Sequence, residues 1–105
     1  MALLTLKTPD CIKKQDVFSD KVTVFVDGTK VTGDIKIDKN DQPFLIGFKD
    51  KFTGRVPITL TEVDKNGADE ILGTVTADAA KPGVHTGIFN DDPKFDYRLT
   101  YEVSA

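Results

Sequence analysis

The fold class follows from residues 21–31, which read KVTVFVDGTKV. Valines occupy every second position from Val22 to Val26, and this period of two is typical of a strand that buries one face. Asp27-Gly28 follows the strand and supplies two residues that tolerate the positive φ angles of a tight hairpin turn. The stretch therefore predicts a β-hairpin, with a second strand that runs from Thr29 to Ile37.

The same alternation recurs along the rest of the chain, and no segment shows a sustained helical period. Residues 96–103, DYRLTYEV, place two tyrosines, a leucine and a valine on one face. Polar turn sequences, including Lys49–Gly54 and Lys81–Gly83, separate the strands. Such a chain favours an all-β fold, an antiparallel β-sandwich of about eight strands in a single domain over residues 1–105. The further strands are expected at Leu3–Lys7, Pro43–Phe48, Arg55–Val63, Ile71–Thr76 and Val84–Asn90.

The composition excludes several classes of function. The 105 residues carry 14 Lys and Arg against 17 Asp and Glu, a net charge of -3, so nucleic acid is not expected as a partner. The longest apolar runs, such as Ala2–Leu4, are far shorter than the roughly 20 residues of a transmembrane helix. Residues 1–7 lack the basic start of a secretory signal. This start is compatible with a cytoplasmic protein and with an exported one whose leader is absent from the sequence.

Residues suited to catalysis are scarce. The chain has one Cys and one His, Cys11 and His85, far apart in sequence, and it has no nucleophile elbow or glycine-rich phosphate loop. A zinc site needs three or four Cys and His ligands, so zinc is not expected. Cys11 is expected to pack as a small apolar side chain at the end of the first strand, and His85 to lie at a strand edge. We therefore expect a binding module and not an enzyme.

The most distinctive segment is residues 61–73, TEVDKNGADEILG, in which oxygen-bearing side chains first recur at every second position. Calcium takes about six to eight oxygen ligands, and carboxylates at alternate positions of a loop supply them. Glu62, Asp64 and Asn66 match the first half of an EF-hand loop. Gly73 stands where that loop needs a bidentate glutamate, and strands flank the segment, so an EF-hand is excluded.

The segment resembles the third calcium-binding loop of the C2 domain family, the eight-stranded β-sandwiches of calcium-dependent lipid-binding modules. In that loop two acids separated by one residue precede a third acid, which stands directly before an aliphatic pair and a glycine. Glu62, Asp64 and Glu70 stand at these positions, and Ile71–Gly73 ends the motif. The resemblance implies that these acids bind Ca2+.

The family's first calcium loop carries two acids between its first two strands. Residues 11–20, CIKKQDVFSD, look like a shortened version of it, with Asp16 and Asp20, although Lys21-Val22 replaces the Pro-Tyr pair that usually follows. In a sandwich the two loops would lie at one end, where their carboxylates would raise one another's pKa unless a cation neutralised them. The implied calcium ligands are Asp16, Asp20, Glu62, Asp64 and Glu70.

The resemblance also implies a partner, because open positions on a bound calcium ion accept an anionic ligand such as a lipid headgroup. Phe18 would be an apolar tip beside the ion, and Lys13, Lys14 and Lys21 would lie at the same end. Two alternatives stay open. One is a metal-free immunoglobulin-like interaction or adhesion module, in which Asp64–Gly67 is an ordinary hairpin turn. The other is a calcium-dependent lectin, in which glycan hydroxyls take the open positions.

Overall fold

A computed structural model describes residues 1–13, 20–32, 35–37, 46–62, 70–89 and 96–104. These ranges contain nine strands, one more than expected because the predicted strand over Thr29–Ile37 is divided in two. The strands are β1 (Ala2–Lys13), β2 (Asp20–Val26), β3 (Thr29–Lys30), β4 (Ile35–Ile37), β5 (Lys49–Phe52), β6 (Arg55–Glu62), β7 (Glu70–Asp78), β8 (Gly83–Phe89) and β9 (Asp96–Ser104). The all-β prediction is confirmed. In the part of the chain that is described, no helix is long and apolar enough to cross a membrane.

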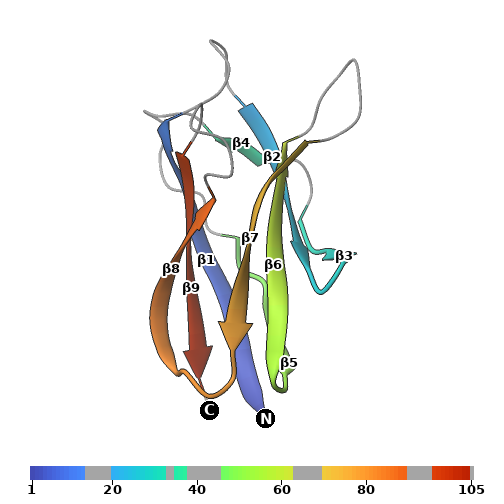
Figure 1. Ribbon diagram of the computed structural model, residues 1–105, viewed down its shortest axis with the longest axis vertical. Helices are drawn as coiled ribbons and strands as arrows, with labels where there is room; N and C mark the ends of the chain where they lie inside the picture. The colour runs from blue at the N-terminus through green and yellow to red at the C-terminus, as the bar shows by residue number, and fades with distance from the viewer. Residues whose placement is uncertain (14–19, 33–34, 38–45, 63–69, 90–95, 105) are drawn as a thin grey trace.

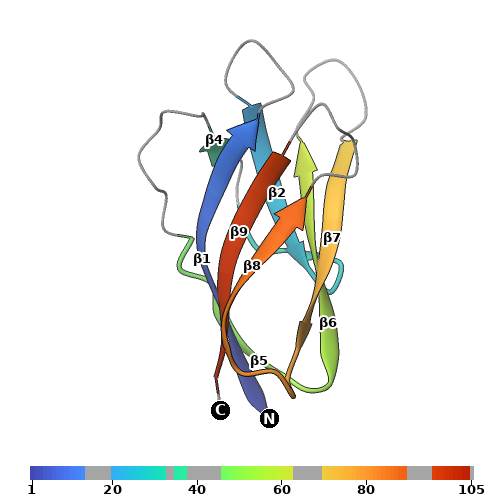
Figure 2. The same ribbon diagram turned by 60° about the vertical axis from the view of Figure 1, so that its left-hand side comes forward.

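Two sheets pack face to face, as Figure 1 and Figure 2 show from two sides. One sheet has the strand order β5-β1-β9-β8, and the other has the order β3-β2-β6-β7 with β4 also paired to β2. All strand pairs within the described ranges are antiparallel. The predicted antiparallel sandwich is therefore confirmed.

The core lies between the inward faces of the two sheets. Val22 and Val24 are fully buried, as the alternation of residues 21–26 predicts. The predicted apolar face of β9 is buried as well, from Tyr97 to Val103. Burial of such side chains contributes about 1.5–3 kcal/mol each, which is the main driving force for a sandwich without a disulfide. The fully buried large side chains are Tyr97, Phe89, Leu4, Leu6, Ile58, Leu60, Leu72, Leu99, Val22, Val24 and Val103.

The hairpin predicted at Asp27-Gly28 is present. Val26 pairs with Thr29, so the turn has two residues, and Asp27 and Gly28 have φ angles of 52° and 78°. Two successive positive φ angles are characteristic of the turn type that matches the twist of the flanking strands.

The strand that follows this hairpin is interrupted. β3 pairs with Phe25 and Val26, and β4 pairs with the other end of β2. Between them Val31 N donates to Val24 O at 3.0 Å, and Val24 N donates to the side-chain Oγ1 of Thr32 at 3.1 Å. The hydroxyl of Thr32 thus accepts the hydrogen bond that a backbone carbonyl of a continuous strand would accept. The alternation of residue types did not predict this interruption.

The prediction of a strand over Pro43–Phe48 and a turn over Lys49–Gly54 is wrong in its described part, and residues 43–45 lie outside the described residues. Residues 46–48 lie beside β1, with Ile46 N donating to Lys7 O at 2.8 Å and Leu6 N donating to Phe48 O at 2.9 Å, but they are not a strand. Gly47 has a φ of 76°, which interrupts the extended conformation. The strand is β5, inside the predicted turn Lys49–Gly54, and the turn itself is confined to Thr53 and Gly54.

β1 is longer than the predicted Leu3–Lys7. It continues through Pro9 to Lys13. The pairing of β1 with β9 shifts register between Leu6 and Pro9, and the pairing of β1 with β5 covers only Ala2–Thr5. Pro9 therefore lies at an irregularity beyond the β5 pairing, where a missing N–H is tolerated.

β7 and β8 belong to different sheets but approach each other closely at one side of the sandwich. A Cβ built on Gly87 of β8 would lie 2.8 Å from Val75 Cγ2 of β7, and one on Gly73 of β7 would lie 3.1 Å from the Cα of Phe89. Gly73 and Gly87 are both buried. Two glycines without side chains therefore allow the sheets to converge at this side.

Candidate functional site

Four strand ends that border the predicted calcium loops lie at the same end of the sandwich, opposite the two chain termini (Figure 1). β1 ends at Lys13 and β2 begins at Asp20, on either side of the first loop. β6 ends at Glu62 and β7 begins at Glu70, on either side of the second. Figure 2 shows the same arrangement after a rotation of 60°. We call this the loop end.

The sheet register brings the acidic positions of the loop end together. Glu62 pairs with Val22 of β2 on one side and with Glu70 of β7 on the other. Directly opposed residues of antiparallel strands have Cα atoms about 4.5–5.5 Å apart. Asp20 lies two positions before Val22 on β2, the strand next to β6. Three of the five predicted ligand positions, those of Asp20, Glu62 and Glu70, therefore lie on the neighbouring strands β2, β6 and β7. Glu62 and Glu70 are directly paired, and Asp20 is two residues from the level of that pair.

A register shift in the β6–β7 pair creates the opposition of Glu62 and Glu70. Leu60 pairs with Gly73, but Thr61 pairs with Ile71, so Leu72 is an extra residue on β7. Leu72 is fully buried, while Ile71 has 60% of its surface exposed. Regular pairing would have set Ile71 opposite Glu62, and the bulge sets Glu70 there instead.

Glu62 is half-buried at the mouth of the sandwich, and its Oε2 atom is shielded from solvent. It follows the buried Leu60 by two residues and so continues the inward-facing row of β6. Asp16 and Asp64 lie outside the described residues, and Asp20 and Glu70 are placed here by their backbone positions alone. Among the residues whose side chains are described, no group of three acidic, His or Cys side chains is arranged to hold a metal ion.

The two residues considered for nucleophilic catalysis are separated by the sheet register. Cys11 pairs with Tyr97 of β9, and His85 pairs with Tyr101, four residues farther along the same strand. Four residues of a strand span roughly 13 Å. His85 belongs to the edge strand β8, and its ring stacks on Tyr101 with the ring centroids 5.3 Å apart. Burial raises the pKa of the Tyr101 hydroxyl. This register argues against a Cys11–His85 dyad.

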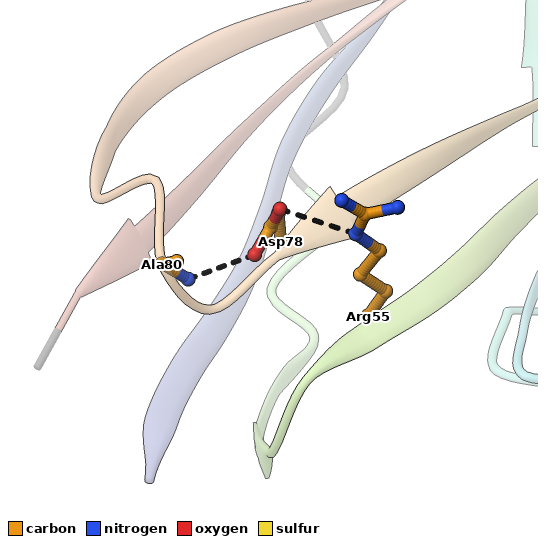
Figure 3. Close-up of polar contacts among 3 residues, drawn as sticks. All are labelled: Arg55, Asp78 and Ala80. Atoms are coloured by element: carbon orange, nitrogen blue, oxygen red, sulfur yellow. Dashed lines mark hydrogen bonds and ion pairs between the residues drawn. The ribbon is translucent and has the colours of Figure 1, made fainter.

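A second polar group, not predicted from the sequence, lies at the opposite end of the sandwich, at the turn from β7 to β8 (Figure 3). Asp78 Oδ1 accepts from Ala80 N at 2.9 Å, and Asp78 Oδ2 accepts from Arg55 Nε at 3.3 Å. The hydrogen bond from the backbone N–H of Ala80 is the main cause that lowers the pKa of Asp78 below its ordinary value. Desolvation opposes this effect, and the charges of Arg55 and Lys81 lower the pKa further. Lys81–Gly83 indicated a turn, but no motif marked Arg55 as its neighbour.

Comparison with known proteins identifies the architecture. No family model and no curated protein sequence matches this chain. A solved structure entitled "Structure of a C2 domain" matches it over 100% of both chains, with a TM-score of 0.63 and 14% sequence identity. The chain has a C2-like fold. At this identity the similarity extends to the fold alone, so the chain is a divergent C2-like sandwich, as the loop motifs predicted.

Proposed function

We propose that this C2-like domain is a non-enzymatic calcium-binding module. In this proposal Glu62, Asp64 and Glu70 of the β6–β7 connection and Asp16 and Asp20 of the β1–β2 connection bind the ion. The observation that carries the proposal is the register at the loop end, where Glu62 is opposed by Glu70 on one side and lies two residues from the level of Asp20 on the other.

The reason for a cation is electrostatic. Like charges directly opposite each other on paired strands are destabilising, and several carboxylates in one place raise one another's pKa. Calcium accepts oxygen ligands in a flexible geometry and neutralises such a group. Coordination positions that the protein leaves open would then take an oxygen from an anionic lipid headgroup, so that the ion bridges the domain and its partner.

Calcium titration of the parent protein and of Asp64→Asn tests the proposal. A ligand at about 100 times its Kd stabilises the folded state by about 2.7 kcal/mol, and each kcal/mol moves the melting midpoint of a domain of this size by roughly 4–8 °C. Calcium should therefore raise the midpoint of the parent by at least 10 °C relative to EDTA. Asp64→Asn should lose most of this shift and most of the heat of binding in isothermal titration.

Asp50→Asn is the matched control, since Asp50 is an exposed residue of β5 and undergoes the same change in charge. It should retain the full calcium shift. Identical melting curves in calcium and EDTA for the parent would contradict calcium binding and favour a metal-free interaction module. Sedimentation with phosphatidylserine vesicles, phosphatidylcholine vesicles and immobilised glycans in calcium would then distinguish a lipid-binding module from a lectin.

A further inference from the structure

A surface cavity of about 400 Å³ lies at the end of the sandwich opposite the loop end. Its lining comes from both sheets, with Arg55 of β6, Asp78 at the end of β7 and His85 of β8, and with Lys81 in the connecting turn. Thr76 and Tyr101 complete the wall. Among the described residues, none at the loop end lines this cavity.

The guanidinium of Arg55 is oriented at this cavity by its contact with Asp78. Arg55 and Asp78 are directly opposed on β6 and β7, and the contact uses Nε of the guanidinium. The Asp78 carboxylate is itself fixed by the Ala80 N–H, as Figure 3 shows. Within the described residues no hydrogen bond reaches the two Nη atoms of Arg55, whose side chain is 75% exposed. A planar fork with two free nitrogens is suited to binding two oxygens of an anion.

The turn supplies a second cation and a rigid wall. Lys81 N donates to Asp78 O at 3.0 Å, and Lys81 O accepts from His85 Nε2 at 2.8 Å, so the backbone of Lys81 is tied on both sides. The stacking of the His85 ring on Tyr101 fixes the imidazole. The ammonium group of Lys81 has no ion-pair partner among the described residues and is exposed.

The cavity carries a charge opposite to that of the whole chain. Arg55 and Lys81 contribute two positive charges and Asp78 one negative charge, which leaves a local excess of one positive charge in a chain of net charge -3. Both oxygens of Asp78 already accept hydrogen bonds from the protein, so its charge is partly neutralised where it stands. Donor groups of the lining residues include the Nη groups of Arg55, the Lys81 ammonium and the hydroxyl of Thr76.

We propose that this cavity is a binding site for a tetrahedral oxyanion, namely a phosphate or sulfate group. Two cations and a hydroxyl from different elements line the cavity. The tetrahedral oxygens of a phosphate face several directions and can meet such donors together, whereas the two oxygens of a carboxylate lie in one plane. The site is independent of calcium, because its residues and the calcium loops lie at opposite ends of the sandwich.

NMR titration of the 15N-labelled protein with inorganic phosphate, in EDTA and at constant ionic strength, tests the site. We expect saturable shifts of the Arg55 Nε–H and of the amides of Ala80 and Lys81. Lys81→Gln should weaken phosphate binding by about tenfold or more, since a hydrogen bond to a charged group is lost. Lys81→Gln breaks no side-chain hydrogen bond or ion pair within the described residues, so the variant is expected to fold like the parent.

Lys30→Gln is the matched control, because Lys30 is exposed on β3, at the far edge of the same sheet from β7. It should bind phosphate like the parent. Equal weakening in both variants, shifts that do not saturate, or the same shifts with chloride would overturn the proposal. Vesicles containing phosphatidic acid, tested without calcium, identify the source of the group. Sedimentation that Lys81→Gln abolishes assigns a lipid phosphate, and phosphate binding without sedimentation assigns a soluble one.

Discussion

Replacement of Gly87 by alanine tests the close approach of β7 and β8. The new Cβ would lie 2.8 Å from Val75 Cγ2 and 3.2 Å from Val75 Cγ1, whereas carbon atoms in favourable contact are about 3.5–4.0 Å apart. Val75 is β-branched, so it has few alternative rotamers with which to move away. We expect Gly87→Ala to lower the free energy of unfolding by about 1–3 kcal/mol, the usual cost of overpacking.

The sign of this effect is diagnostic. Where space is available, Gly→Ala stabilises a protein by about 0.4–1 kcal/mol, because alanine restricts the unfolded chain. Thermal melting and urea unfolding of Gly87→Ala, Val75→Ala and the double variant measure the interaction. The double variant should be more stable than the sum of the single effects predicts, with a coupling of about 0.5–3 kcal/mol. Thr86→Ala, at an exposed position of the same strand, should change stability by less than about 0.5 kcal/mol. A neutral or stabilising Gly87→Ala, or an additive double variant, would refute the proposed contact.

Three further substitutions test other parts of the structure. Thr32→Val should cost about 1–3 kcal/mol in urea unfolding because the N–H of the buried Val24 loses its acceptor, and Thr32→Ser should restore it; equal stability of both variants would contradict the bond. Asp78→Asn should lower the urea midpoint at pH 7, and the difference should shrink as the pH falls below 3.8 and through the lowered pKa of the folded state, because a carboxyl with a lowered pKa stabilises only while it is ionised; a difference that does not shrink as the pH falls would contradict the charge effect. Glu70→Gln should raise the melting midpoint in EDTA by relieving repulsion from Glu62 and should reduce the stabilisation by calcium; a lower midpoint in EDTA would contradict the repulsion.

The sequence predicted the fold well where alternation and turn chemistry agree. Val22–Val26 and Asp27-Gly28 gave a correct hairpin, because the buried face and the positive φ angles are both properties of individual residues. β9 was correct for the same reason. The position of β5 was not predicted, because its residues Lys49–Phe52 are charged and exposed apart from Phe52. An edge strand of this kind owes its conformation to pairing with β1, which a local pattern does not contain.

The candidate sites were predicted unequally. The motif of residues 61–73 singled out Glu62 and Glu70, whose backbone positions lie at the loop end, since the spacing of acids is a local property. The cavity at the opposite end was missed because Arg55 and Lys81 belong to separate segments that meet only when β6 pairs with β7 and the chain turns into β8. Either residue alone is an ordinary surface cation.

The bulge at Leu72 connects the fold to the proposed function. Two needs compete on β7, since Leu72 must fill the core while the calcium motif calls for an acid near Glu62. In a regular strand paired to β6, Thr61 would oppose Leu72 and Glu62 would oppose the apolar Ile71. One extra residue resolves the conflict, because it keeps Leu72 buried, leaves Ile71 exposed and moves Glu70 opposite Glu62. Like charges at two directly opposed positions are destabilising, and in the proposed function a cation at the loop end offsets this cost.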